Sequence, residues 1–204
     1  MKLPLITLFG DSIIDNGVYV GSEELSVLQH MNHRRPDKLF EQRAVDGDTT
    51  KDVLSSQLID SHTGKSVLSI GGNDLLQNMR LIATEEKVTP VAFFESLGGV
   101  ADGFTERYQK ILSMLQGPCL VMTIYNPSFH KDPAMAHLQR SCEMVVGMFN
   151  DIIQRLVCQH GKDLLELRDI FVDEKDYANP IEPSHAGGGK LADAILGWAE
   201  KTKG

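Results

Sequence analysis

A serine follows the first apolar segment of the chain, at a place where it could act as a nucleophile. Residues 5–9 are an apolar run that ends at Gly10, and Asp11 and Ser12 follow directly. Such a run is typical of a buried parallel strand followed by a tight turn. Ligand sites of open α/β sheets lie at the carboxyl ends of strands. The same tripeptide is also typical of a turn that caps a helix, so alone it is weak evidence for a nucleophile.

Two further polar junctions follow predicted strands. Residues 38–45 form a second, weaker predicted strand, and the polar segment after it contains Gly47. Residues 66–70 form a third, which stops at two glycines followed by Asn73 and Asp74. Glycine lets the backbone turn sharply at such points. Because the carboxyl ends of parallel strands share one edge of a sheet, we expect these junctions to converge near the serine.

The whole chain alternates apolar strand-like runs with amphipathic helical patterns. This order predicts an α/β fold with a mostly parallel sheet, covered by helices on both faces and connected by right-handed crossovers. The expected strands are residues 5–9, 38–45, 66–70, 119–125 and 164–172, and the expected helices begin near residues 22, 49, 104, 138 and 190.

Four separated blocks resemble the SGNH hydrolases of the GDSL esterase/lipase family. The blocks are Gly10-Asp11-Ser12, the glycine Gly47, the run Gly71-Gly72-Asn73-Asp74, and the region around Glu182 to His185. The resemblance covers essentially the whole chain and implies a flavodoxin-like three-layer α/β/α sandwich with strand order 2-1-3-4-5. No Gly-x-Ser-x-Gly elbow surrounds the serine, which argues against the α/β-hydrolase fold.

The resemblance implies a serine esterase that hydrolyses small carboxylic esters through an acyl-enzyme, without metal or cofactor. Ser12 would attack the carbonyl, His185 would act as general base and then acid, and Glu182 would orient the imidazole. The oxyanion would be held by the backbone N–H groups of Ser12 and Gly47 and by the amide of Asn73. The resemblance therefore implies a small-molecule ester as the binding partner of the protein.

Two alignments of the last block are open. Matching the spacing between acid and histidine gives Glu182 and His185, with glutamate in place of the usual aspartate. Matching the flanking apolar, proline and glycine residues instead places Glu182 at the histidine position and Asn179 at the aspartate position. We favour the first alignment, because His185 is the sole histidine in the block and the chemistry needs a base.

The second alignment has different consequences for the chemistry. Ser12 then relies on Glu182 as its base, recruits His185 from a slightly different backbone position, or is not catalytic at all. Asp173 and Asp176 are further candidates for the orienting acid. The irregular block from Asn179 to His185 therefore leaves a second function open. The protein would be a catalytically impaired member of the fold that binds a ligand in the same pocket. A nucleotide or flavin binder is disfavoured, because no glycine-rich phosphate loop is present.

Size and composition restrict the remaining classes. The chain has 204 residues, 42% hydrophobic and 24% charged, which predicts one domain over residues 1–204. A net charge of -8 argues against a nucleic-acid or acidic-membrane surface. No apolar stretch approaches the roughly 20 residues that a membrane helix needs, nor does a signal-peptide pattern precede the first strand, so we expect no membrane insertion and a cytoplasmic location.

Some residues that suggest chemistry have simpler interpretations. Cys119, Cys142 and Cys158 lie in apolar segments at no metal-ligand spacing, so we expect buried free thiols. His30 and His33 lack acidic or cysteine partners at ligand spacing, which favours a solvated helix end over a metal pair. Residues 77–90 have no strong period and are expected to be a surface segment near the site.

Overall fold

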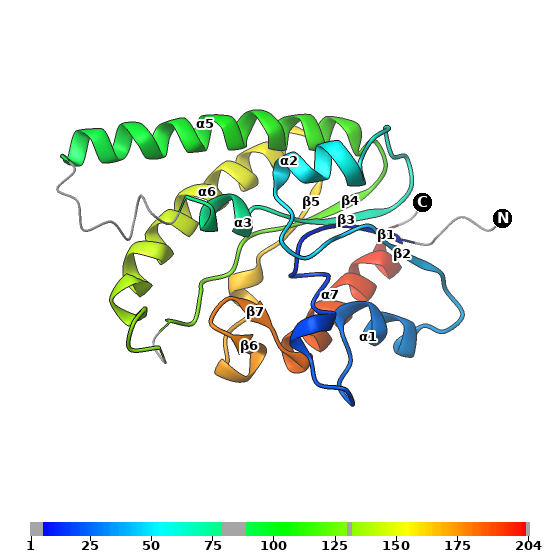
Figure 1. Cartoon of the computed structure of the whole chain (residues 1–204). Helices are drawn as coiled ribbons and strands as arrows, with labels where there is room; N and C mark the ends of the chain where they lie inside the picture. Colours follow the sequence, from blue (N-terminus) through cyan, green and yellow to red (C-terminus); the bar gives the residue numbers. More distant parts are fainter. Residues whose placement is uncertain (1–5, 79–88, 130–131, 203–204) are drawn as a thin grey trace.

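The computed structural model describes residues 6–78, 89–129 and 132–202. Its main sheet is entirely parallel and has the order β2-β1-β3-β4-β5 (Figure 1), which confirms the predicted fold class and strand order. Consecutive crossovers leave the β1–β3 pair in opposite directions, and ligands of open α/β sheets bind at such a switch point. The strands are β1 Ile6–Gly10, β2 Phe40–Gln42, β3 Ser66–Ser69, β4 Cys119–Met122 and β5 Asp163–Leu165.

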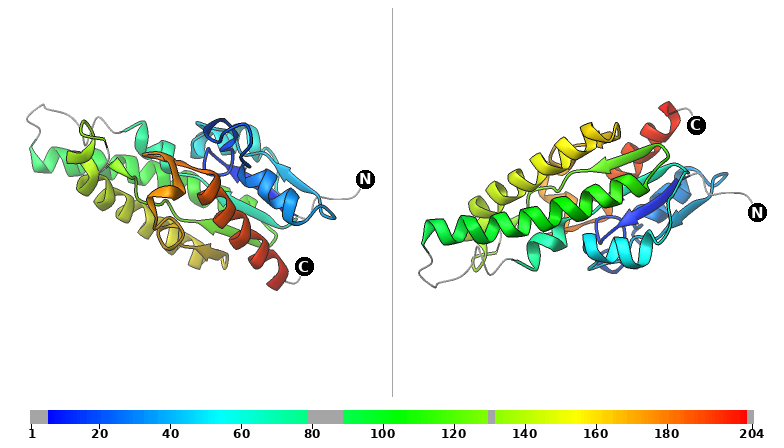
Figure 2. Two further views of the ribbon diagram at one scale, coloured as in Figure 1. Left: turned by 90° about the horizontal axis from the view of Figure 1, so that it is seen from below. Right: turned by 90° about the horizontal axis from the view of Figure 1, so that it is seen from above.

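Helices cover both faces of this sheet, as Figure 2 shows from below and from above. On one face α5 (Pro90–Met114) and α6 (Gln139–Gln159) pack over strands β1, β3 and β4 around the buried rings of Phe9, Phe104 and Phe149. On the other face α1 (Val27–Arg34) and α7 (His185–Lys201) enclose a second apolar cluster. Every residue of the three central strands is buried, because both faces are covered.

The fifth strand is shorter than predicted. It ends at Leu165, and residues Leu167–Asp169 form a 3₁₀ turn instead. The hydroxyl of Thr123 accepts the backbone N–H of Leu167 at 2.8 Å, and the carboxylate of Glu166 accepts that of Arg168 at 3.0 Å. These side-chain acceptors replace a strand partner, so the prediction of a strand over 164–172 was wrong beyond its first residues.

Two helices begin earlier than predicted. α5 starts at Pro90 rather than near residue 104, with Thr89 as its N-cap. α7 starts at His185 rather than at Lys190, because the hydroxyl of Ser184 accepts the N–H groups of the first turn. The helix therefore includes the three consecutive glycines at positions 187–189. A Cβ at Gly187 would lie 2.3 Å from the carbonyl oxygen of Asp176, so glycine allows the helix to pack there.

Three short elements complete the part of the fold that surrounds the sheet edge. α2 (Thr50–Asp52) follows Thr49 and continues as a π-helical turn over Val53–Gln57, and α3 (Gly72–Leu76) follows β3. The antiparallel hairpin of β6 (Tyr177–Asn179) and β7 (Glu182–Pro183) was not predicted. No helix in the described ranges is long and apolar enough to cross a membrane.

Glycine at position 10 is required by the close approach of β1 and β3. Gly10 has a φ of 140°, and a Cβ there would lie 1.9 Å from the carbonyl oxygen of Ser69. Changing Gly10 to Ala should therefore lower the free energy of unfolding by about 3 kcal/mol or more, measured by urea denaturation. Gly147, within α6, has no atom within 4 Å of its Cβ position, so Gly147→Ala should instead stabilise the protein by about 0.5–1 kcal/mol. Equal effects would contradict this reasoning.

Candidate active site

Ser12 lies in a tight turn at the end of β1. The carboxylate of Asp11 accepts the backbone N–H of Ile13 at 3.1 Å. The carbonyl oxygen of Asp11 accepts those of Ile14 at 3.1 Å and Asp15 at 2.9 Å. Asp11 thus supports the turn, and within the described ranges no acceptor binds the backbone N–H of Ser12. This N–H is free to donate to a ligand.

The loop that carries Gly47 is held against the end of β1. The side chain of Gln57 binds Gly10 in both directions, at 2.8 Å to its N–H and 2.7 Å to its carbonyl, and also donates to the carboxylate of Asp48 at 2.7 Å. Gly47 has a φ of 86°, and its N–H has no acceptor among the described residues. It does not line the pocket described below, but it adjoins Asp48, which contacts that pocket's Asn73.

Asn73 lies in α3, directly beyond the end of β3. Its amide nitrogen donates one hydrogen bond to the carbonyl oxygen of Asp48 at 3.0 Å. An amide NH₂ carries two donors, so one remains after this bond. The bond fixes the orientation of the amide relative to the Gly47 loop, and the second N–H is available to the pocket that Asn73 lines.

The neighbouring Asp74 anchors α3. Its carboxylate accepts the N–H of Thr50 at 2.9 Å and the hydroxyl of Thr50 at 2.6 Å, and Arg107 approaches it at 3.3 Å. Asp74 is buried, and a cation and two hydrogen bonds offset the cost of burying its charge. This network ties α2, α3 and α5 together behind Asn73.

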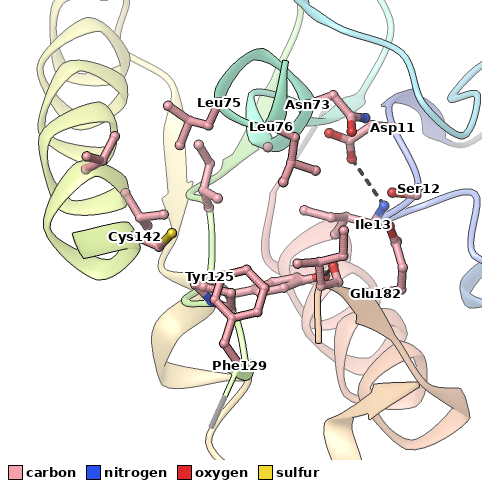
Figure 3. Close-up of a pocket in the computed structure, with 16 residues that line it drawn as sticks. Asp11, Ser12, Ile13, Asn73, Leu75, Leu76, Tyr125, Phe129, Cys142 and Glu182 are labelled. Atoms are coloured by element: carbon pink, nitrogen blue, oxygen red, sulfur yellow. Dashed lines mark hydrogen bonds between the residues drawn. The ribbon is translucent and has the colours of Figure 1, made fainter. Parts of the chain in front are cut away.

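Ser12 and Asn73 line a largely apolar pocket with a volume of about 70 Å³ (Figure 3). Its wall opposite Ser12 comes from the end of β4, from the N-terminal half of α6 and from α3. Tyr125, Phe129 and the buried thiol of Cys142 belong to this wall, and the sequence analysis had not placed them near the site. The pocket is lined by Asp11, Ser12, Ile13, Gly72, Asn73, Leu75, Leu76, Ile124, Tyr125, Pro127, Phe129, Cys142, Val145, Val146, Ile181 and Glu182.

Glu182 shares this pocket with Ser12. Glu182 is only 6% exposed, and one of its carboxylate oxygens, Oε2, has no hydrogen-bond partner in the described part of the chain. Burial raises the pKa of Glu182 to about 7, while hydrogen bonding from the Ser12 hydroxyl lowers it and the charge of Asp46 adds to the rise. A carboxyl group with this pKa can gain or lose a proton near neutral pH.

The hairpin that carries Glu182 is fixed by contacts on both sides. The side-chain oxygen of Asn179 accepts the N–H of Ile181 at 3.0 Å and of Glu182 at 3.1 Å. The hydroxyl of Tyr125 donates to the carbonyl of Ile181 at 2.6 Å, and Asn16 donates to that of Pro183 at 3.2 Å. Asn179 therefore shapes the turn that presents the carboxylate to the pocket.

The structure does not place His185 in the pocket with Ser12. Its Nδ1 accepts the backbone N–H of Leu25 at 2.9 Å, and its ring lies 4.5 Å from that of His30. The other acids named as orienting candidates, Asp173 and Asp176, bind Lys190 at 3.4 and 2.7 Å. Of the predicted catalytic residues, Ser12 and Glu182 thus meet in one pocket, whereas His185 lies against α1.

Two smaller expectations fail for physical reasons. His30 is buried rather than solvated, because its Nε2 contacts the carbonyl of His185 at 3.0 Å beneath α7. Cys158 is exposed near the end of α6, whereas Cys119 and Cys142 are buried as expected. The described residues contain no group of three possible metal ligands. Residues 79–88, most of the segment expected near the site, lie outside the described ranges.

Comparison with known proteins gives a match only at the level of structure. No protein-family model and no curated protein matches the sequence. Phospholipase A1 from Streptomyces albidoflavus NA297 is similar in structure with a TM-score of 0.68 and 16% identity, over 96% of this chain and 99% of that one. Axe2, an acetylxylan esterase from Geobacillus stearothermophilus, has a TM-score of 0.62 and 16% identity, over 96% and 94%.

A third similar structure carries the name of the motif itself. It is a member of the lipolytic G-D-S-L family from Veillonella parvula DSM 2008, with a TM-score of 0.63 and 14% identity, over 94% of this chain and 96% of that one. These three proteins share the fold along nearly the whole length of the chain. The chain therefore has the α/β fold of the SGNH/GDSL hydrolases, as its four motif blocks predicted.

Proposed function

We propose that this protein is a serine hydrolase that cleaves small carboxylic esters through an acyl-enzyme intermediate. The observation that carries the proposal is the position of Ser12. Its hydroxyl faces a pocket in which its own backbone N–H and one N–H of Asn73 are left without an acceptor by the described residues. Hydrolysis of an ester needs this combination of a nucleophile and preset donors for the oxyanion.

The donors suit the charge that develops during acyl transfer. When the Ser12 oxygen attacks, the carbonyl oxygen of the ester becomes an oxyanion, and donors fixed in advance stabilise it without rearranging. Asn73 is fixed by Asp48, and the Ser12 N–H is fixed by the Asp11 turn. The N–H of Gly47, on the same loop as Asp48, is the third proposed donor.

The pocket supports a small acyl group as the substrate's buried part. Its volume of about 70 Å³ corresponds to roughly five waters at 10–15 Å³ each. Its walls are mainly aliphatic and aromatic, so a short hydrocarbon chain would be favoured over a sugar or a charged group. The alcohol part of the ester would lie toward the open side of the pocket.

One observation favours the alternative of a non-catalytic ligand-binding protein of the same fold. No histidine is among the described residues that line the pocket, although serine hydrolases usually use one as the base. The same pocket would then bind a small apolar ligand without turning it over.

Labelling with a fluorophosphonate separates the two functions. The folded protein at pH 8 should be labelled at Ser12, as located by peptide mapping, and Ser12→Ala should abolish both labelling and hydrolysis of p-nitrophenyl acetate. The substitution removes one hydroxyl, so the thermal midpoint should change little. Absence of label above a heat-denatured control would favour the binding protein.

The oxyanion donor can be tested against a neighbouring asparagine. Asn73→Ala should lower kcat by about 10²–10³-fold, measured with the same ester at saturating concentration. Asn78 donates to the carbonyl of Asp74 at 2.8 Å and lies outside the pocket lining, so Asn78→Ala is the matched control and should retain kcat. Similar losses in both variants would assign Asn73 a structural role only.

The size of the pocket predicts a preference for short acyl chains. p-Nitrophenyl acetate and butanoate should have a kcat/KM about tenfold or more above that of the octanoate. Val146 lines the pocket from α6. Val146→Phe should reduce the butanoate rate more than the acetate rate, and a uniform loss across chain lengths would contradict this assignment of the acyl site.

A further inference from the structure

We propose that Glu182 itself takes the proton from Ser12, so that a serine–glutamate pair replaces the histidine-based triad. This inference rests on the proposed ester hydrolysis at Ser12 and concerns the identity of its general base. It assigns Glu182 a role different from the orientation of His185 that its spacing had suggested.

The geometry around Glu182 carries the proposal. Glu182 and Ser12 line the same side of the pocket, Glu182 from the hairpin and Ser12 from the end of β1 (Figure 3). Both are only 6% exposed, and the hydroxyl interacts with the carboxylate. The carboxylate Oε2 is buried without a partner in the described structure. A buried acceptor without a hydrogen-bond donor lowers the stability of the fold. In the proposed reaction, this carboxylate accepts the proton of Ser12.

The histidines of this region are engaged elsewhere. Nδ1 of His185 accepts the N–H of Leu25, and its ring packs on His30. His30 in turn contacts Arg34 at 2.7 Å and the carbonyl of His185 at 3.0 Å. Neither imidazole lines the pocket. A base must lie within hydrogen-bond reach of the proton it removes. Glu182 shares the pocket with Ser12, and hydrogen bonding from the Ser12 hydroxyl lowers its pKa, whereas His185 does not line the pocket.

Asp11 is the other carboxyl group in the pocket, and it already has a structural partner. Its Oδ1 accepts the N–H of Ile13 in the turn that holds Ser12. Removing that acceptor would disturb the turn, whereas Glu182 has a free oxygen. The alignment that places Glu182 at the position of the family's histidine agrees with this geometry. Asn179, at the aspartate position, binds backbone N–H groups of the hairpin.

The groups around Glu182 are acidic or neutral. Asp11 from the β1 turn, Asp46 from the Gly47 loop, Tyr19 from the segment before α1 and Tyr125 from the end of β4 all interact with it electrostatically. No cation of the described chain is among the groups that shift its pKa. With a pKa of about 7, Glu182 is a carboxylate above neutrality and is progressively protonated below it. Its capacity as a base is therefore lost as the pH falls.

The proton balance of the reaction closes on these two residues. As the Ser12 oxygen bonds to the ester carbon, its proton passes to the Glu182 carboxylate. The resulting carboxylic acid gives that proton to the alcohol oxygen as the carbon–oxygen bond breaks. Water then attacks the acyl-enzyme, loses a proton to Glu182, and the proton returns to the Ser12 oxygen as the carboxylic acid product leaves.

The test compares rates of fluorophosphonate labelling and of p-nitrophenyl acetate hydrolysis from pH 5 to 9. In the wild type both should rise about tenfold per pH unit below an inflection near pH 7 and level off above it. Glu182→Gln keeps the size of the side chain, and it should lower both rates by at least about 10²-fold and remove the inflection. His185→Asn retains an acceptor for the N–H of Leu25 and should keep the wild-type rates and profile.

A second acid serves as the electrostatic control. Asp46→Asn removes a neighbouring charge that raises the pKa of Glu182, so it should move the inflection to lower pH without lowering the plateau. Loss of activity in His185→Asn together with retention in Glu182→Gln would overturn the inference and leave ester hydrolysis intact. No labelling of the wild type at any pH would instead refute the proposed hydrolase. Circular dichroism confirms that each variant is folded.

Discussion

The candidate site depends on how closely β1 approaches β3 where both strands end. At Gly10 the two backbones come so near that no side chain fits, and the chain then turns at once. Asp11 satisfies the next three backbone N–H groups of the turn but not that of Ser12. The turn after this tightly packed strand end therefore leaves the backbone N–H of Ser12 without an acceptor in the described ranges, and Ser12 lines the pocket. Gln57 and Asn73 bring the remaining loops to the same point.

Electrostatics distinguishes two kinds of buried acid at this edge of the sheet. Asp74 is bound by Arg107 and Thr50, so its charge is balanced. Burial raises the pKa of both Asp11 and Glu182, and the charge of Glu182 raises that of Asp11 further. A carboxyl group kept in a low-dielectric pocket without a cation is shifted toward neutrality. This is the physical condition under which glutamate can exchange protons near pH 7.

The sequence predicted the sheet and three of its polar junctions because their signals are local. Glycine and asparagine directly after an apolar run determine a strand end, whatever packs around it. The last block could not be assigned in the same way. Whether Glu182 or His185 faces Ser12 depends on the β6–β7 hairpin, which Asn179 and Tyr125 hold through contacts distant in the sequence. Similarly, α5 and α7 begin earlier than their apolar patterns predicted, after the N-caps Thr89 and Ser184.

The hairpin that carries Glu182 belongs to a different sheet from the strand that carries Ser12. The contacts of Tyr125 and Asn16 with the hairpin reach backbone carbonyls, not the Glu182 side chain. The proposed nucleophile and the proposed proton acceptor therefore lie on separate units of the fold. A substitution at position 182 can therefore change the proposed acid–base group, and with it the pH range of the reaction, while the packing of the main sheet is kept.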